Sequence, residues 1–276
     1  MSLIDEALPV DPLPKSWEPE SRVGDMLRGK RGLVVGIANE HSIAFGCAAK
    51  LRGFGAELAV TYVNEKAERF VRPLAEEIDA RLVLPLDVEK EGELDAVFDR
   101  IRQEWGRLDF LIHSLAFAPR EDLHGRVIDC SAAGFLQAMR VSCYSFIEMA
   151  GLAEPLMTQG GALLTMTYYG ADKVVNHYVM RPVKAALEAT TRYLSVELGE
   201  KGIRVYAVSP GPLKTRAESG IAQFDELVEA AVTRSAAHRL VDIAEVGRVV
   251  AFLVGGGASG MTGDTIYVDA GLHVVA

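Results

Sequence analysis

The sequence predicts one α/β domain built on a doubly wound, mostly parallel sheet of seven strands. Seven short runs are almost continuously apolar and are bounded by glycine, proline or aspartate, which is typical of strands buried on both faces. Amphipathic segments lie between them, and this alternation predicts right-handed crossovers onto a parallel sheet. The predicted strands cover residues 32–37, 57–63, 81–88, 108–116, 161–168, 203–210 and 264–271.

The predicted helices occupy segments between these strands. In 91–105, Leu94, Phe98 and Ile101 share one helical stripe, which we expect to face the sheet. Such a stripe belongs to the core and indicates nothing about function. The predicted helices cover residues 42–53, 65–79, 91–105, 131–158, 181–199 and 242–254.

Composition indicates a single domain that can bury one large core. The chain has 276 residues, of which 49% are apolar and 24% charged, as is usual for a globular domain. We expect this domain to cover 29–276. The acidic, proline-rich segment 1–28 predicts a poorly ordered N-terminal arm.

Charge and cysteine content narrow the partners and the compartment. The formal net charge is −9, and lysine and arginine are scattered, so the field of the protein disfavours nucleic acid and anionic membranes as partners. The sequence contains no apolar run of transmembrane length and no signal-peptide pattern at its N-terminus. Cys47, Cys130 and Cys143 show neither disulfide nor metal spacing. We therefore expect a cytoplasmic protein without a metal site.

Histidines give no contrary signal. None of them has further ligands at the spacing of a metal site, so we expect structural roles for them. The residues in question are His113, His124, His238 and His273.

The first strand leads into a candidate phosphate-binding turn. In GIANEHSIAFG, Gly36 ends the strand, and Ser42 and Ile43 open the next helix. Glycine permits backbone conformations closed to other residues, and the N–H groups of a helix start can bind a pyrophosphate. The segment is not a G-x-G-x-x-G match, so taken alone it is equally consistent with an ordinary strand-to-helix turn.

Other strand ends carry residues suited to the rest of a dinucleotide. Asp87 and Val88 follow the third strand, where the carboxylate can accept a hydrogen bond from an adenine amino group; a helix cap is the alternative role for Asp87. The sequence HSLAFAP at 113–119 has small residues against which a ribose and a nicotinamide can lie. Because open parallel sheets bind ligands at the carboxyl ends of their strands, the set predicts a Rossmann-like dinucleotide site.

The second strand bears on the choice of cofactor. It ends in TYVNEK at 61–66, where Glu65 would prefer a free ribose hydroxyl, whereas Lys66 or Arg69 could bind a 2′-phosphate. We expect NADH, and these residues leave NADPH open.

These segments together resemble the enoyl-acyl carrier protein reductases of bacterial fatty-acid synthesis, a divergent branch of the short-chain dehydrogenase/reductases. The resemblance runs from about Lys30 to Ala270 and rests also on TYYGADKVV, Lys184 and SPGPLKTRAESGI at 209–221. It implies that NADH reduces the trans-2 double bond of an enoyl thioester, with acyl carrier protein as the carrier. The positions that would touch the cofactor are Gly36, Ser42, Ile43, Asp87, Val88, Ser114, Leu115, Lys184, Leu213 and Thr215.

The resemblance also implies the catalytic groups. In the family, hydride addition places negative charge on the thioester carbonyl oxygen, and a phenol hydrogen bond there stabilises the transition state more than the ground state. A lysine, here Lys184, binds the ribose and favours the phenolate form of a nearby tyrosine. Tyr168 occupies the position of a further family tyrosine at the end of the fifth strand; the alternative role is an aromatic side chain at the rim of the sheet.

The segment NHYVMRPVK at 176–184 departs from the family pattern, which places six residues between the catalytic tyrosine and the lysine. Tyr178 leaves five before Lys184, and His177 leaves six. Seven helical positions rotate a side chain by roughly 700°, about 20° short of two turns, which favours His177 on the face of the lysine. Tyr178 remains the alternative, because residues before Pro182 can be loop-like if the proline lies in the first helical turn.

The altered spacing leaves two further functions open. One is a diverged short-chain reductase acting on another carbonyl or enone, and the other is a catalytically silent paralogue that binds the cofactor. Arg181 stands where the family usually has glycine. A long cation near the mouth of the site would alter its shape and charge; the alternative, which we expect, is a solvated residue at the helix start.

Two regions predict how substrate and subunits are accommodated. After the sixth strand, a Pro-Gly-Pro turn and a helical segment predict a substrate lid over about 211–235, with a surface insertion as the alternative. The helices over about 131–157 and 183–199 are apolar around more of their circumference than a sheet contact requires. This surplus indicates subunit contacts, and the resemblance implies a homotetramer.

Overall fold

The computed structural model describes residues 26–123, 126–169, 174, 179–213 and 224–275. It confirms the predicted sheet, with seven strands in the order β3-β2-β1-β4-β5-β6-β7 and every neighbouring pair parallel. The strands are β1 (Arg31–Val35), β2 (Glu57–Tyr62), β3 (Leu82–Pro85), β4 (Phe110–His113), β5 (Gly161–Met166), β6 (Ile203–Pro210) and β7 (Thr265–Val268).

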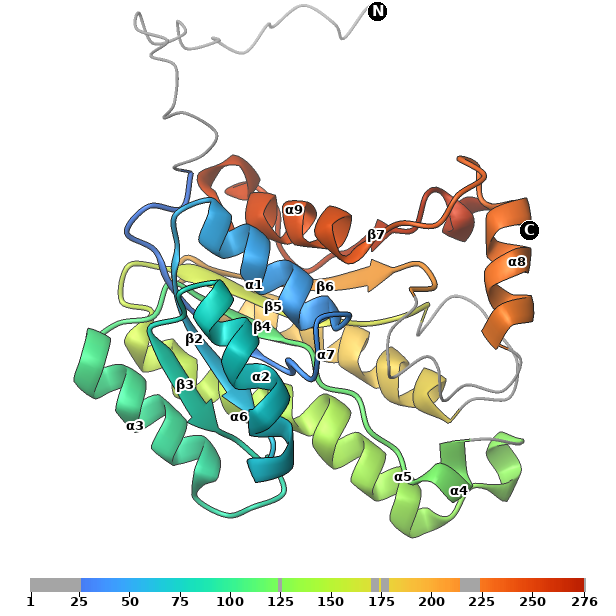
Figure 1. Ribbon diagram of the computed structural model, residues 1–276, viewed down its shortest axis with the longest axis horizontal. Coiled ribbons are helices and arrows are strands. Elements are labelled where there is room, and N and C mark those ends of the chain that lie inside the picture. The colour runs from blue at the N-terminus through green and yellow to red at the C-terminus, as the bar shows by residue number, and fades with distance from the viewer. Residues whose placement is uncertain (1–25, 124–125, 170–173, 175–178, 214–223, 276) are drawn as a thin grey trace, which may run out of the picture.

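Helices cover both faces of this sheet (Figure 1). Their bounds are α1 (Ile43–Gly53), α2 (Glu65–Glu77), α3 (Glu93–Trp105), α4 (Arg120–Leu123), α5 (Ala132–Met139), α6 (Ser145–Ala153), α7 (Met180–Gly199), α8 (Phe224–Arg234) and α9 (Ile243–Val254). In the described part of the chain, none of the helices combines the length and the apolarity that a membrane crossing requires.

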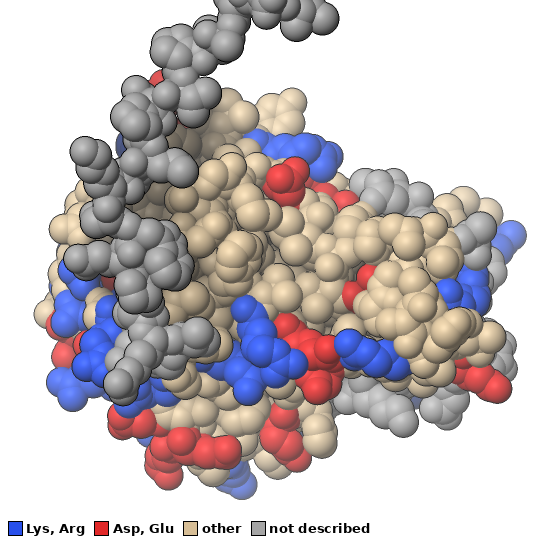
Figure 2. Space-filling view, turned by 90° about the horizontal axis from the view of Figure 1, so that it is seen from above, with Lys and Arg blue, Asp and Glu red and all other residues tan. Residues whose placement is uncertain are grey.

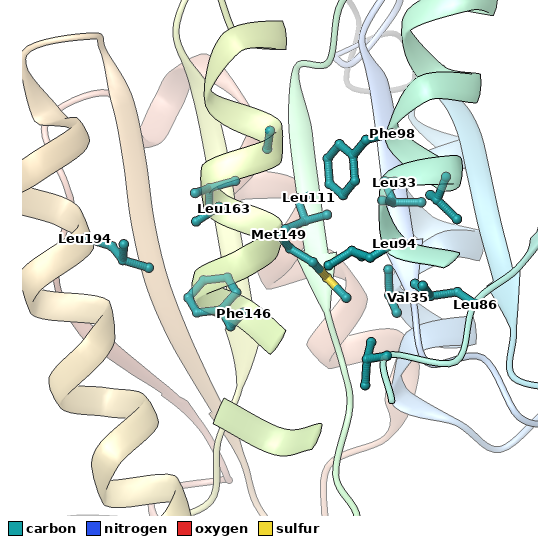
Figure 3. Packing of buried hydrophobic residues seen from close by; sticks show 14 of the residues in the cluster. Leu33, Val35, Leu86, Leu94, Phe98, Leu111, Phe146, Met149, Leu163 and Leu194 are labelled. Carbon is teal, nitrogen blue, oxygen red and sulfur yellow. The ribbon is translucent and has the colours of Figure 1, made fainter. Parts of the chain in front are cut away.

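Alternate residues of the strands enter two separate cores. Leu33 and Val35 of β1 pack on one face of the sheet with Phe98 of α3 and Phe146 of α6 (Figure 3). Val34, between them, enters the opposite core, which α1 and α9 cover. This is why the strands read as continuous apolar runs: successive side chains point to opposite faces, and both faces are buried.

The predicted helix over 131–158 is interrupted. A π-helical turn (Arg140–Tyr144) separates α5 from α6, and a 3-10 turn (Glu154–Leu156) follows. Within the π turn, the Ser142 hydroxyl lies 3.0 Å from the Phe117 N–H, which donates to it, and 3.3 Å from the Phe117 carbonyl. The turn therefore holds the segment that follows β4.

The structure describes only part of the predicted N-terminal arm and only part of the predicted lid. Leu27, which the predicted arm includes, is fully buried, and its N–H donates to the Phe54 carbonyl at 2.8 Å, so the core contains a residue of that arm. The rest of the arm, residues 1–25, lies outside the described residues. Of the predicted lid, 211–213 and α8 are described and 214–223 are not.

Charged side chains are mixed on the surface. Figure 2 shows one face of the molecule, on which lysine and arginine side chains lie beside carboxylates. This matches the scattered placement of basic residues along the sequence.

Candidate active site

A cavity of about 560 Å³ lies at the carboxyl ends of the strands, and its size is usual for a small-molecule site. Residues that follow β1 and β4 line it, and these two strands are neighbours at the point where the strand order reverses. Open α/β sheets bind ligands at that point. The predicted residues that the structure brings together in its walls are Gly36, Ser42, Ile43, Asp87, Val88, Ser114, Leu115, Tyr168 and Lys184.

Gly36 allows the backbones after β1 and β4 to approach closely. Its φ is +107°, and a Cβ built on it would lie 2.1 Å from the Ser114 carbonyl oxygen. Any other residue would collide with this backbone atom and would also adopt a strained conformation. The sequence therefore needs glycine here for geometric reasons, whether or not a ligand is bound.

The N-terminus of α1 opens onto the cavity. Ser42 is its N-cap residue, but its side chain makes no cap hydrogen bond. Instead the hydroxyl donates to the Asn39 carbonyl at 2.5 Å. A helix start whose N–H groups are not capped by that side chain is suited to bind an anion.

Asp87 shapes the turn after β3. Its Oδ1 accepts a hydrogen bond from the Glu89 N–H at 3.0 Å, and its own N–H donates to Glu93 Oε2 at 2.7 Å. The N-cap of α3 is Gly92, so the alternative role of Asp87 as the cap of this helix is wrong.

The wall that follows β2 is uncharged. It is formed by Thr61, near the end of β2, and by Val63 and Asn64, which follow the strand. The three residues that we weighed for cofactor choice are exposed on α2, and the cavity wall contains none of them; they are Glu65, Lys66 and Arg69.

Lys184 is a buried cation in the cavity wall. Only 7% of it is exposed, and its ammonium donates to the Met166 carbonyl at 2.7 Å and to the Leu115 carbonyl at 3.4 Å. Burial lowers its pKa to about 8, against the opposing effects of Cys143 and Glu188. The lysine thus joins the ends of β4 and β5 and keeps a titratable charge beside them.

The prediction that Arg181 is solvated is wrong. Arg181 is 8% exposed and lines the cavity. Its guanidinium carbon lies 4.4 Å from the centre of the Tyr168 ring, and its Nη1 donates to the carbonyls of Tyr168 at 3.1 Å and Tyr169 at 3.2 Å. A planar guanidinium can stack on a ring and donate hydrogen bonds at the same time. The chain after β5 offers it an aromatic ring and two carbonyl groups.

Tyr169 is a feature that sequence reasoning missed. It is buried, has a φ of +44°, and its hydroxyl donates to Asp269 Oδ2 at 2.6 Å. Asp269 also accepts from the His273 N–H at 2.7 Å, and the His273 ring stacks on Tyr267 at 4.1 Å. The two tyrosines that follow β5 have ring centres 4.8 Å apart, so this network lies directly behind Tyr168. A buried phenol with a carboxylate partner leaves no signal in sequence periodicity.

His113 has a structural environment, as expected. It is fully buried, with ring nitrogens 2.8 Å from Thr165 Oγ1 and 2.9 Å from Ser145 Oγ. Burial, aided by the charge of Lys184, lowers its pKa to about 3. The imidazole is therefore neutral. No cluster of acidic, histidine or cysteine side chains suited to a metal ion occurs among the described residues.

Four predicted positions are not part of this cavity as described. Leu213 is buried in the core that α1 and α9 cover, and it does not line the cavity. His177, Tyr178 and Thr215 lie outside the described residues.

Comparisons with known proteins agree with this geometry. The family model for enoyl-(acyl carrier protein) reductase matches residues 36–273. A Rhizobium meliloti (strain 1021) enoyl-[acyl-carrier-protein] reductase [NADH] is 43% identical over 256 residues, 92% of this chain and 94% of that protein. The enoyl-[acyl-carrier-protein] reductase [NADH] FabI of Nostoc sp. (strain PCC 7120) is 44% identical over 253 residues, 90% of this chain and 98% of its own length.

Solved structures give the same result. The reductase of Anaplasma phagocytophilum in complex with NAD superposes with a TM-score of 0.89 at 44% identity, covering 92% of this chain and 98% of that one. The Bacillus cereus enoyl-acyl carrier protein reductase, solved with NADP+ and indole naphthyridinone, has a TM-score of 0.89 at 42% identity, covering 91% of this chain and 99% of its own.

Proposed function

Since the chain belongs to the enoyl-acyl carrier protein reductase family, we propose that its cavity is the place where NADH reduces the trans-2 double bond of an enoyl thioester. The observation that carries this is Lys184, a buried ammonium that bridges the ends of β4 and β5 beside Tyr168. The cavity also lies where open α/β sheets bind ligands, and its size is usual for a small-molecule site, which supports this proposal.

The walls fit NADH from one end to the other. The open start of α1 and the close approach at Gly36 suit the pyrophosphate. We assign Asp87 and Val88 to the adenine, and Ser114 and Leu115 to the nicotinamide ribose; all four line the cavity, which supports the assignment. The uncharged wall after β2 supports NADH over NADPH, because it offers no cation to a 2′-phosphate.

The chemistry divides between the cofactor and the protein. NADH supplies the hydride. Tyr168 supplies a phenol on the cavity wall, where a hydrogen bond to the thioester carbonyl oxygen stabilises the charge that develops there. Lys184 would hold the ribose of bound NADH and would add a positive charge to the same region.

Two residues, His177 and Tyr178, are the candidates for the second catalytic ring, the one beside Lys184. Regular helical rotation favours His177 in register with Lys184, but α7 begins at Met180, so the described helix does not extend to either candidate. Pro182 lies in the first turn of α7, as the alternative with Tyr178 requires. A direct comparison of the two side chains has to decide.

The test is NADH oxidation with crotonyl and longer enoyl thioesters, measured for the native chain and for His177→Phe and Tyr178→Phe. We expect turnover by the native chain and a loss of kcat of about 10²–10⁴-fold in one variant only, because only one of these two side chains would take the position beside Lys184. As a control, NADH should not be oxidised when the thioester is left out. NADH binding without turnover would instead support a catalytically silent paralogue.

Partners and location complete the proposal. We propose that acyl carrier protein carries the enoyl thioester, that a lid over about 211–235 covers it, and that the chain works in the cytoplasm. The three cysteines of the chain are free thiols, which supports a reducing compartment.

We also propose a homotetramer. Large apolar side chains are exposed on α6, on α7 and in the π turn that precedes α6, and α6 and α7 pack against each other. The exposed residues there are Tyr144, Ile147, Tyr193 and Val196. Exposed apolar side chains that gather on adjacent elements are typical of subunit contacts.

A further inference from the structure

We propose that Arg181 is a positioning residue, which holds Tyr168 in the orientation that the reduction uses. The inference rests on the proposed function, because it assigns a purpose to the Tyr168 hydroxyl. It concerns a residue that the family resemblance leaves without a role.

The Arg181 side chain makes several contacts at the end of β5. The guanidinium of Arg181 lies over the Tyr168 ring, with its carbon 4.4 Å from the ring centre. The same group donates to the carbonyls of Tyr168 and Tyr169. Ring and backbone of Tyr168 are therefore held by one rigid, planar group.

The segment after β5 keeps its shape through contacts with its surroundings. Past the end of β5, the Thr167 N–H donates to the Val208 carbonyl at 2.8 Å, and the Tyr169 N–H donates to Ser209 Oγ at 3.3 Å. These bonds hold the N–H side of the segment, and Arg181 holds its carbonyl side. Because Tyr169 has a φ of +44°, which is unfavourable for tyrosine, the segment keeps this shape only while its surroundings impose it.

Arg181 also adds a second positive charge to the cavity wall. Arg181 and Lys184 are three positions apart on α7, so they share a helix face, and both line the cavity. A cation over the face of a phenol polarises the ring and its O–H bond. A carboxylate, Glu188, lies behind them and accepts a hydrogen bond from Thr167 Oγ1 at 2.6 Å. Tyr168 therefore faces the cavity beside two cations.

The experiment compares Arg181→Met and Arg181→Lys in the full chain. We expect kcat to fall by about 10–100-fold in both, because a small misplacement of a catalytic group costs this much and because lysine cannot stack and donate to both carbonyls. The dissociation constant of NADH should change by less than about twofold. Arg100→Met, on α3 and 51% exposed, is the matched control and should keep native kinetics.

A double-mutant cycle shows whether Arg181 acts through Tyr168. In a Tyr168→Ala background, Arg181→Met should cause no further loss of kcat, because the group to be positioned is absent. Multiplying losses, native kcat in Arg181→Met, or full rescue by Arg181→Lys would each overturn the proposal. If Arg181→Met does not fold, the lysine variant carries the same comparisons.

A spectroscopic readout keeps the inference separate from the proposed function. In protein labelled with 3-fluorotyrosine, the 19F resonance of Tyr168 is identified by its absence in Tyr168→Phe. We expect it to shift or broaden in both Arg181 variants and to stay unchanged in Arg100→Met. An unchanged Tyr168 resonance overturns the inference, whereas absence of turnover by the native chain overturns the proposed function alone.

Discussion

At the scale of single residues, the proposed site contains a lysine whose pKa is lowered by burial. The Lys184 ammonium is buried and satisfied by two backbone carbonyls, and desolvation lowers its pKa to about 8. Below this pH the charged form dominates, and above it the neutral amine does. We therefore expect the proposed interaction of Lys184 with a ribose to depend on pH within a range that is easily measured.

A pH series of NADH binding tests this property. We expect the dissociation constant to be constant below about pH 7 and to rise above about pH 8, by up to about tenfold per unit, because the ammonium is lost there. Lys184→Arg keeps its charge throughout, so its dissociation constant should stay flat over the same range. An equal rise in both proteins would show that another group titrates.

At the scale of elements, glycines determine how closely α1 and α9 pack. A Cβ on Gly46 of α1 would lie 2.5 Å from the Ile243 carbonyl oxygen, and one on Gly247 of α9 would lie 2.4 Å from the Gly46 carbonyl oxygen. Backbone atoms cannot move aside as a flexible side chain can. The helix that presents its N-terminus to the cavity is thus placed by direct backbone contact with α9.

Two alanine substitutions in the same helix separate packing from helix propensity. Gly46→Ala should lower the free energy of unfolding by about 1–3 kcal/mol, because the new methyl group overpacks the contact. Gly53→Ala, where an added Cβ would meet no atom within 4 Å beyond its chain neighbours and its own helix backbone, should leave it unchanged or raise it by up to about 1 kcal/mol. Urea unfolding curves measure both values, and equal values would contradict this account of α1.

Element boundaries show where sequence periodicity is informative. The strands and the helices α1, α2, α3, α7 and α9 begin and end close to their predicted positions, since each follows an apolar repeat. The predicted helix over 131–158 is interrupted by a π turn, in which Ser142 binds the backbone at Phe117. A contact between positions 25 residues apart has no counterpart in a local pattern.

At the scale of the whole molecule, the helices on one face of the sheet present apolar side chains to the outside. On α7, Tyr193 is 74% exposed and Val196 is 79% exposed, although the opposite side of the helix is buried in the core. Exposing such residues is unfavourable for a monomer. This is the physical basis for expecting an assembly through this face.

Mass measurement by light scattering tests the assembly. We expect the native chain to be a tetramer and Val196→Glu to form smaller species, because a buried carboxylate without a partner destabilises an interface. Phe70→Glu, at a 53% exposed position on α2, should leave the mass unchanged. A native monomer, or a tetramer that survives Val196→Glu, would exclude this face.

The amino-acid sequence by itself determined the α/β class and the seven parallel strands, and its motifs carried the resemblance to the family and indicated the strand ends at which we propose the cofactor site. The class and the strands follow from local patterns, because burial on both faces and the turn after each strand constrain neighbouring residues. Only the tertiary structure decided that Arg181 lies over Tyr168 instead of in solvent, and that Tyr169 binds Asp269, 100 positions along the chain. Such contacts depend on strand order and register, which bring side chains together after the chain has folded, and no local pattern encodes them.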